Sequence, residues 1–201
     1  MNNQAVKGVA VYCASSSNIA PLFFDQARNV GRLLARAGIP VISGGGSAGL
    51  MAAVIEGAVE CGGEAIGILP QFMIDKGWDH PQLTRRLITE TMHERKMAMA
   101  QMSRAVIALP GGVGTLDELF EIITWRQLHI YPGNVVICNT DGFYNLLFEH
   151  LDHTARSGFM RPEAPARLWQ VADTAEQAVA LALAPPTDPG VQYQMPERKQ
   201  Q

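Results

Sequence analysis

The sequence has few charged residues and no excess of basic ones. Charged side chains make up 17% of its 201 residues, and 16 Lys and Arg stand against 19 Asp and Glu, for a formal net charge of −3. This balance argues against a nucleic-acid binder, and it means that a phosphorylated ligand has to be held by local groups. Hydrophobic residues make up 47%, enough for a sizeable core.

Cysteine is scarce, and long apolar runs are absent. Cys13, Cys61 and Cys138 are odd in number, far apart and flanked by apolar residues, so we expect reduced thiols in a cytoplasmic protein, with no metal site. The polar start, 1–6, lacks the regions of a secretion signal. No run of about eighteen apolar residues exists, so we expect no membrane span.

Short apolar strands alternate with helices along most of the chain. Strands are expected at 6–12, 40–43, 64–69, 86–90, 105–109, 135–138 and 168–171, and helices at 22–37, 50–60, 92–103, 115–128, 143–157 and 174–183. This alternation predicts an α/β fold, Rossmann-like and doubly wound, with a mainly parallel sheet and helices on both faces. We expect an irregular loop over 71–83, a single domain over 1–184 and a mobile tail over 185–201.

Two glycine-rich turns follow predicted strands, at the edge where a parallel sheet binds ligands. The first, 43–51, has the G-x-G-x-x-G spacing of dinucleotide-binding folds. However, it follows the second strand, and the next strand ends at Pro70 without an acidic residue for a ribose. We therefore favour phosphate or ribose contact through Gly45 and Gly46 over NAD binding or a purely structural turn.

The second turn, 110–114, is more specific because three glycines fall within four positions. Thr115 can cap the following helix, and it can also donate its hydroxyl to a phosphate. Thr115 and Glu118 have the spacing of a capping box, so a structural role for Glu118 stays open. Glu121 and Thr124 continue the helical face of Glu118, which gives an acidic stripe beyond what a cap requires.

Two adjacent cations, Arg95 and Lys96, stand at the start of a predicted helix. The helix dipole disfavours cations there, so we expect a carboxylate or phosphate partner for them. The preceding His93 is expected to pack or to form a hydrogen bond rather than to catalyse.

The segment 92–96 followed by 110–118 (PGGVGTLDE) resembles the Lonely Guy (LOG) family of cytokinin riboside 5'-monophosphate phosphoribohydrolases. The resemblance covers roughly residues 6–160, including 44–51 and 141–145. It implies a Rossmann-like homodimer without cofactor. It also implies hydrolysis of a nucleoside 5'-monophosphate, a cytokinin riboside 5'-monophosphate or AMP, to free base and ribose 5-phosphate. The old label "lysine decarboxylase" of related proteins is discounted, since no pyridoxal-phosphate lysine context is evident.

By this resemblance, Arg95 and Glu118 are the catalytic pair. Together with the first turn, the expected substrate-binding residues are Gly45, Gly46, Met92, Lys96, Gly111, Gly112, Val113, Gly114, Thr115, Leu116, Asp117, Glu121 and Thr124. One position departs from the family, because the loop after the third strand holds Gly77 where a carboxylate is common. Asp75 or Asp79 is left to replace it, and with Trp78 beside Gly77 the preferred base stays open.

In the expected mechanism, Glu118 stabilises the positive charge that develops on the ribose or activates a water. Arg95 keeps Glu118 ionised and oriented, or contacts the ribose and phosphate, while the 5'-phosphate lies on the amides of 111–115. The main alternative is a non-catalytic nucleotide or molybdenum-cofactor binding protein, followed by an NAD-type oxidoreductase and an AMP sensor. The physiological role, cytokinin production or nucleotide salvage, and the oligomer size also stay open.

Overall fold

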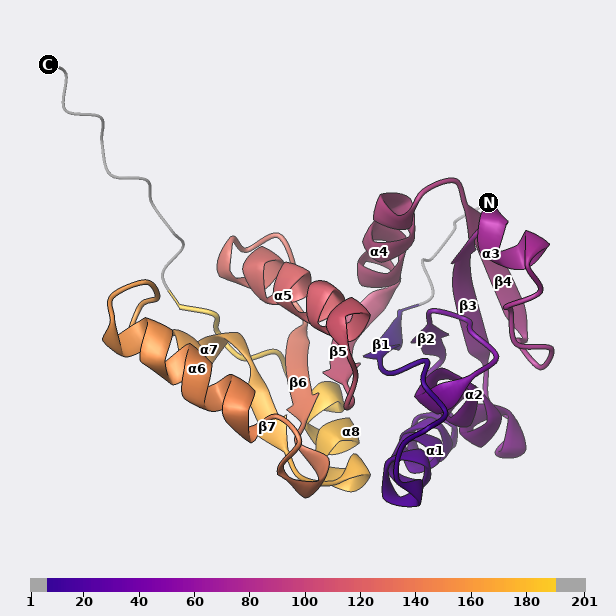
Figure 1. Ribbon diagram of the computed structural model, residues 1–201, viewed down its shortest axis with the longest axis horizontal. Helices are drawn as coiled ribbons and strands as arrows, with labels where there is room; N and C mark the ends of the chain where they lie inside the picture. The colour runs from indigo at the N-terminus through magenta and orange to yellow at the C-terminus, as the bar shows by residue number, and fades with distance from the viewer. Residues whose placement is uncertain (1–6, 191–201) are drawn as a thin grey trace, which may run out of the picture.

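The computed structural model describes residues 7–190 as one sheet between two layers of helices (Figure 1). The strands are β1 (Gly8–Tyr12), β2 (Val41–Ser43), β3 (Ala65–Pro70), β4 (Arg85–Thr89), β5 (Ser103–Ala108), β6 (Asn134–Cys138) and β7 (Gln170–Ala172). They lie in the order β4-β3-β2-β1-β5-β6-β7, and each neighbouring pair is parallel. The predicted Rossmann-like doubly wound fold is confirmed.

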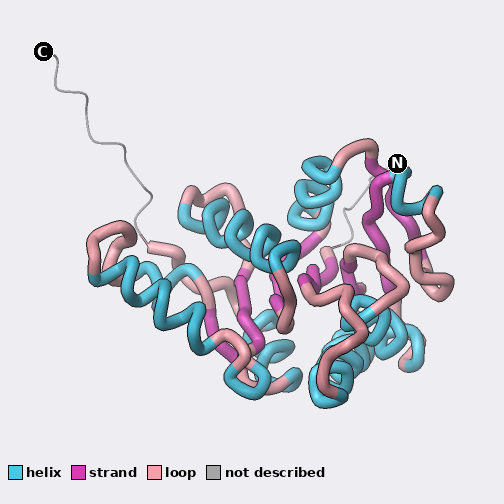
Figure 2. Tube along the Cα trace, in the orientation of Figure 1, coloured by secondary structure: helices cyan, strands magenta, loops and turns pink. Residues whose placement is uncertain are grey.

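The helices are α1 (Pro21–Arg36), α2 (Gly49–Glu60), α3 (Gln71–Asp75), α4 (Met92–Gln101), α5 (Val113–Gln127), α6 (Asn145–Arg156), α7 (Ala164–Leu168) and α8 (Ala175–Leu183), with a 3-10 turn η1 (Thr140–Gly142). Figure 2 shows α1, α2 and α8 on one face of the sheet and α4, α5, α6 and α7 on the other. Within the described chain, none of the helices is both long and apolar enough to cross a membrane.

Strand β1 shows why the strands are continuous apolar runs. Val9 and Val11 pack against α1, α2 and α8, whereas Ala10 and Tyr12 belong to the core below α4 and α5. Successive side chains of a strand point to opposite faces, so a strand covered on both sides is apolar at every position.

Two short helices and several boundaries differ from the sequence prediction. The segment expected to be an irregular loop, 71–83, begins with α3, and α7 was not expected. Helix α4 ends at Gln101, two residues before the expected end, because Ser103 already begins β5. Helix α6 begins later than the predicted Phe143, since left-handed backbone at Asp141 and Gly142 reverses the chain first.

The first part of the expected C-terminal tail is fastened to the domain. Arg126 donates to the carbonyl oxygen of Thr187 over 2.7 Å, and the backbone N–H of Thr187 donates to the side chain of Asn134 over 3.0 Å. Residues 185–190 therefore contact the sheet and α5, and 191–201 lie outside the described residues.

The sheet changes direction between β1 and β5. From β1 the chain builds outward through β2 and β3 to β4, then returns to place β5 on the other side of β1. Ligands of open α/β sheets bind at the carboxyl ends of the strands beside such a switch point. The segments that follow β1 and β5 meet there, because the N–H of Ala14 donates to the carbonyl oxygen of Pro110.

Candidate active site

A cleft with two halves opens at this switch point. One half, of about 370 Å³, holds most of the polar groups, and we call it the polar half: Ser15, Ser16, Gly112, Gly114, Thr115 and Glu118. The other, of about 390 Å³, is the apolar half, whose large apolar side chains are Met51, Leu69, Met73 and Trp78. Ser15, Gly44, Met51, Met73 and Arg95 line both halves, so the two form one continuous cleft.

Arg95 lies at the border of the two halves, and the cap that fixes the start of α4 determines this position. Thr91 caps the helix by accepting from the N–H of Glu94, whose carboxylate accepts from the N–H of Glu90. These two hydrogen bonds, which the sequence analysis missed, fix the start of α4 and place Arg95 in its second turn, where Nε donates to the carbonyl oxygen of Ile68 in β3. Only 6% of Arg95 is exposed.

The guanidinium of Arg95 has two fixed partners. Nε donates to the carbonyl oxygen of Ile68 over 3.0 Å, and Nη1 donates to Oε1 of Glu118 over 2.9 Å. The group passes close to the first glycine-rich turn, where a Cβ on Gly44 would lie 2.0 Å from Nη2 of Arg95. Glycine at position 44 therefore gives the guanidinium its space.

The start of α5 corrects the capping prediction. The helix begins at Val113 with Gly112 as its N-cap and no side-chain cap, so Thr115 is the third helical residue and forms no capping box with Glu118. Thr115 is buried against Gly111 and lines the polar half. The N–H groups of the first turn have no intrahelical partner, and they face a site suited to an anion.

Glu118 is largely buried, with 12% of its side chain exposed. Burial raises the pKa of Glu118 above its ordinary value, and the positive charge of Arg95 opposes that rise only in part. A carboxyl group with a raised pKa is a better proton acceptor when it is ionised, which suits a general base.

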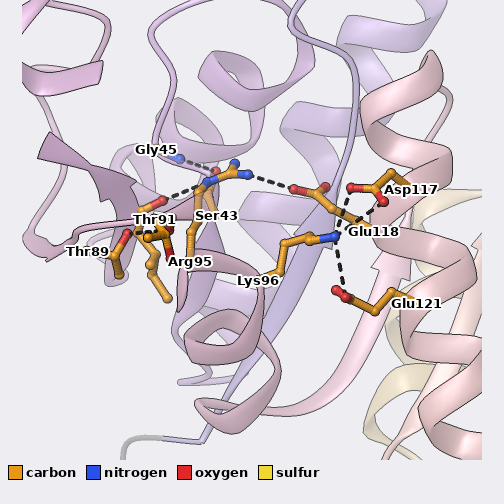
Figure 3. A network of polar contacts seen from close by, with 10 residues as sticks. Ser43, Gly45, Thr89, Thr91, Arg95, Lys96, Asp117, Glu118 and Glu121 are labelled. Carbon is orange, nitrogen blue, oxygen red and sulfur yellow. Dashed lines mark hydrogen bonds and ion pairs between the residues drawn. The ribbon is translucent and has the colours of Figure 1, made fainter. Parts of the chain in front are cut away.

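Lys96 joins two acidic side chains of α5. Its Nζ lies 3.0 Å from Asp117 and 3.3 Å from Glu121 (Figure 3). Partial burial lowers the pKa of Lys96, but the hydrogen bond to Asp117 and the charge of Glu121 outweigh it, so its pKa is raised. Of the two partners that the sequence left open for these cations, carboxylate or phosphate, the structure gives both cations a carboxylate.

The structure divides the predicted substrate-binding residues into two groups. Those that line the cleft are Gly46, Gly112, Val113, Gly114 and Thr115, together with the pair Arg95 and Glu118. Those that lie outside its lining are Gly45, Met92, Lys96, Gly111, Leu116, Asp117, Glu121 and Thr124. Contact of the second group with substrate stays a prediction.

Three residues of the second group have surroundings in the single chain that do not include the cleft. Gly45 has a left-handed backbone and faces Leu69 rather than the cleft. Thr124 is exposed, and its hydroxyl donates to the carbonyl oxygen of Phe120 over 2.7 Å. Met92 is 39% exposed at the start of α4.

The sequence analysis missed several residues of the cleft. Ser15 and Ser16 follow β1 directly, and their place at the carboxyl end of a central strand was a usable signal. Met51, Met73 and Trp78 come from α2, from α3 and from the loop after it, which nothing in the spacing connects. Tertiary packing alone brings these three side chains together.

Neither carboxylate suggested as a replacement at Gly77 lines the cleft. Asp79 forms an ion pair with Nε of Arg86 at 2.8 Å, and Asp75 accepts a hydrogen bond from Gln71 on the same short helix. Both candidates have other partners on the outer side of the loop.

Two other kinds of chemistry find little support in this cleft. Cys13 lines the polar half, but burial, with a contribution from the charge of Glu118, raises the pKa of its thiol, so it is not activated as a nucleophile. Across residues 7–190, no three side chains of His, Cys, Asp or Glu are grouped so that they could hold a metal ion.

Comparison with known proteins identifies the family of the chain. The family described as "Possible lysine decarboxylase" matches residues 51–182. The chain is 35% identical to cytokinin riboside 5'-monophosphate phosphoribohydrolase LOG5 of Arabidopsis thaliana, over 97% of this chain and 90% of that protein. It is 33% identical to the enzyme of that name from Rhodococcoides fascians, over 89% of this chain and 90% of that protein.

Solved structures share the fold at lower identity. The molybdenum cofactor carrier protein of Chlamydomonas reinhardtii matches with a TM-score of 0.66 and 24% identity, over 87% of this chain and 94% of that chain. The molybdenum cofactor binding protein of Rippkaea orientalis matches with a TM-score of 0.65 and 23% identity, over 87% and 94% of the two chains. Identity at this level supports the fold and nothing about the ligand.

The fold and the cleft define a Rossmann-like α/β protein with a glycine-rich turn beside a largely buried Arg–Glu pair. The chain belongs to the LOG family of cytokinin riboside 5'-monophosphate phosphoribohydrolases, the family also described as possible lysine decarboxylases.

Proposed function

We propose that the chain is an N-glycosyl hydrolase that converts a nucleoside 5'-monophosphate, a cytokinin riboside 5'-monophosphate or AMP, to free base and ribose 5-phosphate. The observation that carries this proposal is the buried contact between Arg95 and Glu118, which lies beside the free amides at the start of α5. The names of the relatives from Arabidopsis thaliana and Rhodococcoides fascians support the same reaction.

In this reaction the 5'-phosphate lies on the backbone N–H groups of 112–115, and the hydroxyl of Thr115 adds a donor. This arrangement brings the ribose to Glu118. The bond between C1' of the ribose and the base nitrogen breaks, and its electron pair leaves with the base. Water adds to C1', and one proton of that water ends on the departing base.

Glu118 and Arg95 have separate parts in that step. The carboxylate of Glu118 stabilises the positive charge on the ribose and accepts the proton of the attacking water. Arg95 holds the carboxylate at the border of the two halves of the cleft by its hydrogen bond of 2.9 Å. Because the bond from Nε to Ile68 fixes the guanidinium, the pair is oriented before substrate binds.

The direct test is to incubate the purified protein with AMP and with N6-substituted AMP and to measure free base and ribose 5-phosphate. Glu118→Gln keeps the size of the side chain and should lower kcat by a factor of about 10² or more, while nucleotide binding is retained. Glu149→Gln, at an exposed glutamate of α6, is the matched control and should react at the parent rate. Equal turnover by Glu118→Gln and the parent would refute the role of Glu118.

A non-catalytic carrier is the alternative that the fold allows, because the two molybdenum cofactor proteins share it. A carrier has no need of an Arg–Glu pair at the border of its cleft. Protein that binds nucleotide and releases no base under the conditions above would favour this alternative.

We also propose that the chain forms a homodimer and acts in the cytoplasm. Exposed apolar side chains on the helices that carry Arg95 and Glu118, such as Met97 on α4 and Phe120 on α5, provide surface that a second copy could cover. Free thiols at Cys13, Cys61 and Cys138 suit a reducing compartment. Light scattering should give twice the mass of the chain, and the mass of a monomer would contradict the dimer.

A further inference from the structure

A second cavity opens at the other edge of the sheet, where the strands begin. We call it the amino-edge pocket, and its volume is about 290 Å³. Strands β1, β5 and β6 contribute Lys7, Arg104 and Gly133 at or just before their amino ends, and Ala184 and Pro186 close it from beyond α8. Among the described residues, it shares no part of its lining with the active-site cleft.

An irregularity in the sheet turns Arg104 outward. Strand β5 pairs with β1 at Ser103 and again at Ala105, which leaves Arg104 as an extra residue between them. A bulge of this kind bends a strand and redirects a side chain. Arg104 is accordingly exposed, whereas the other residues of β5 are buried. A Cβ on Gly133 would lie 2.2 Å from the carbonyl oxygen of Arg104, so glycine at this position accommodates the bulge.

The pocket holds two cations and no acidic partner for them. Among the described residues that line it, Lys7 and Arg104 alone are ionisable, and both are exposed. The N–H of Gly8 donates to the carbonyl oxygen of Met102 over 3.0 Å, so the start of β1 lies against the start of β5. Within residues 7–190, neither cation forms an ion pair with a carboxylate. In a chain with a net charge of −3, this arrangement favours an anion in the pocket.

The end of α8 lies at the same pocket, and free carbonyl oxygens at a helix C-terminus would repel an anion. Here they are occupied, because Nδ2 of Asn134 donates to the carbonyl oxygens of Leu181 and Ala184 over 3.0 and 3.1 Å. Oδ1 of the same side chain accepts from the N–H of Thr187 over 3.0 Å. Asn134 thus reduces the repulsion and holds residues 185–190 in place as one wall.

Charge and size select the class of ligand. A guanidinium and an ammonium group together match a phosphate monoester, whose charge near pH 7 is about −1.5 to −2. A carboxylate, with a single negative charge, needs only Arg104. A volume of about 290 Å³ is at the lower end of the range for ligand sites, which suits a small molecule such as a sugar phosphate.

We propose that the amino-edge pocket binds a small phosphate monoester. Arg104 and Lys7 bind the phosphate group, and Pro132 and Pro186 contact the carbon skeleton. The length of β5, roughly 20 Å, separates this pocket from the cleft at the opposite edge. The inference does not depend on the proposed hydrolysis, because it uses none of the cleft residues.

The test is an NMR titration of isotope-labelled protein with ribose 5-phosphate, which observes the two sites separately. The amides of Gly8 and Gly133 report on the amino-edge pocket, and those of Gly112 and Gly114 report on the cleft. We expect the signals of Gly8 and Gly133 to shift and saturate with a Kd of about 1 mM or lower. Ribose, which has no phosphate, should not shift them. Sulfate, which has no carbon skeleton, should bind more weakly by a factor of about three or more.

Two substitutions remove the charges and keep unbranched side chains. Arg104→Met and Lys7→Met should each raise the Kd at the amino-edge pocket by about tenfold, and the double variant should show no saturation there. The signals of Gly112 and Gly114 should respond as in the parent protein. Arg36→Met, at an exposed arginine in the last turn of α1, is the matched control and should bind as the parent does.

The parent protein alone decides the question, even if a variant does not fold. Signals of Gly8 and Gly133 that do not saturate up to about 10 mM ribose 5-phosphate would overturn the proposal. Equal binding of sulfate and ribose 5-phosphate would also overturn it, because the pocket would then hold an adventitious ion only. Neither result bears on the hydrolase proposal, which the release of free base tests.

Discussion

At the scale of single residues, Glu118 determines how the protein responds to pH. Burial raises the pKa of this carboxyl group above its ordinary value of 4.5, and Arg95 restrains the rise. We predict that the acidic limb of kcat/KM has its midpoint above pH 4.5, because only the ionised carboxylate can act as the base. Steady-state rates across pH measure that midpoint.

Replacing Arg95 with Met should move the acidic limb of kcat/KM to higher pH than in the parent protein. The variant loses the positive charge that favours the ionised carboxylate, so we expect the midpoint to rise and kcat to fall by roughly 10². A variant with lower activity and an unmoved limb would show that Arg95 does not act through Glu118.

The same pKa predicts an effect on stability. Because the folded-state pKa of Glu118 is raised, the stability that this group contributes is fully present below its unfolded-state pKa and is lost as pH rises through the folded-state pKa. We therefore expect Tm of the parent minus Tm of Glu118→Gln to decrease from about pH 4 to about pH 7. Calorimetric scans of both proteins in matched buffers test the sign, and a difference that grows with pH would contradict it.

At the scale of elements, two adjacent glycines at the start of α5 have different roles. We expect substitution of Gly111 to lower the stability of the fold and substitution of Gly112 to weaken substrate binding. A Cβ on Gly111 would lie 2.1 Å from Oγ1 of the buried Thr115, whereas a Cβ on Gly112 meets nothing within 4 Å. Gly111→Ala should therefore cost about 1–3 kcal/mol of folding free energy. Gly112→Ala should leave Tm within about 2 °C of the parent, because its backbone suits alanine.

Substrate binding should be affected more by Gly112→Ala than by Gly111→Ala. Gly112 lines the polar half, so a methyl group there approaches the proposed phosphate position and should raise KM for AMP by about tenfold. Thermal scans and Michaelis curves on the two variants make the comparison. A normal KM in Gly112→Ala would place the phosphate elsewhere.

At the scale of the whole molecule, residues 185–190, which follow α8, connect α5 and β6. Arg126 is almost fully buried and bonds to Thr187 and to the carbonyl oxygen of Gly133, and burial lowers its pKa. A chain ending after Ala184 should be less stable than one ending after Gly190 by about 2–4 kcal/mol, because Arg126 then loses partners inside the protein.

Both truncated chains lack 191–201, so the comparison isolates residues 185–190. Their KM for AMP should be equal, since Asn134 and the segment that it holds lie at the amino end of β6, opposite the carboxyl ends that form the cleft. Equal free energies of unfolding in urea would show that these contacts add nothing to the fold.

The alternation of strands and helices, and the two glycine-rich turns, were enough to predict the layers of the sheet and the edge that holds the site. At the start of α5, two local signals competed. Thr115 and Glu118 have the spacing of a cap, but the backbone at Gly112 starts the helix earlier and leaves Glu118 for Arg95. The end of α4 was misplaced because Ser103 can follow either a helix or a strand pattern.

The sequence by itself determined the fold class and the family, because these depend on periodicity and on the spacing of motifs, and it predicted an anionic partner for the two cations of α4. The tertiary structure decided which predicted residues line the cleft, the burial that raises the pKa of Glu118, and the meeting of Met51, Met73 and Trp78. These features depend on distances between segments that are far apart in the chain, which only the packed sheet and helices fix.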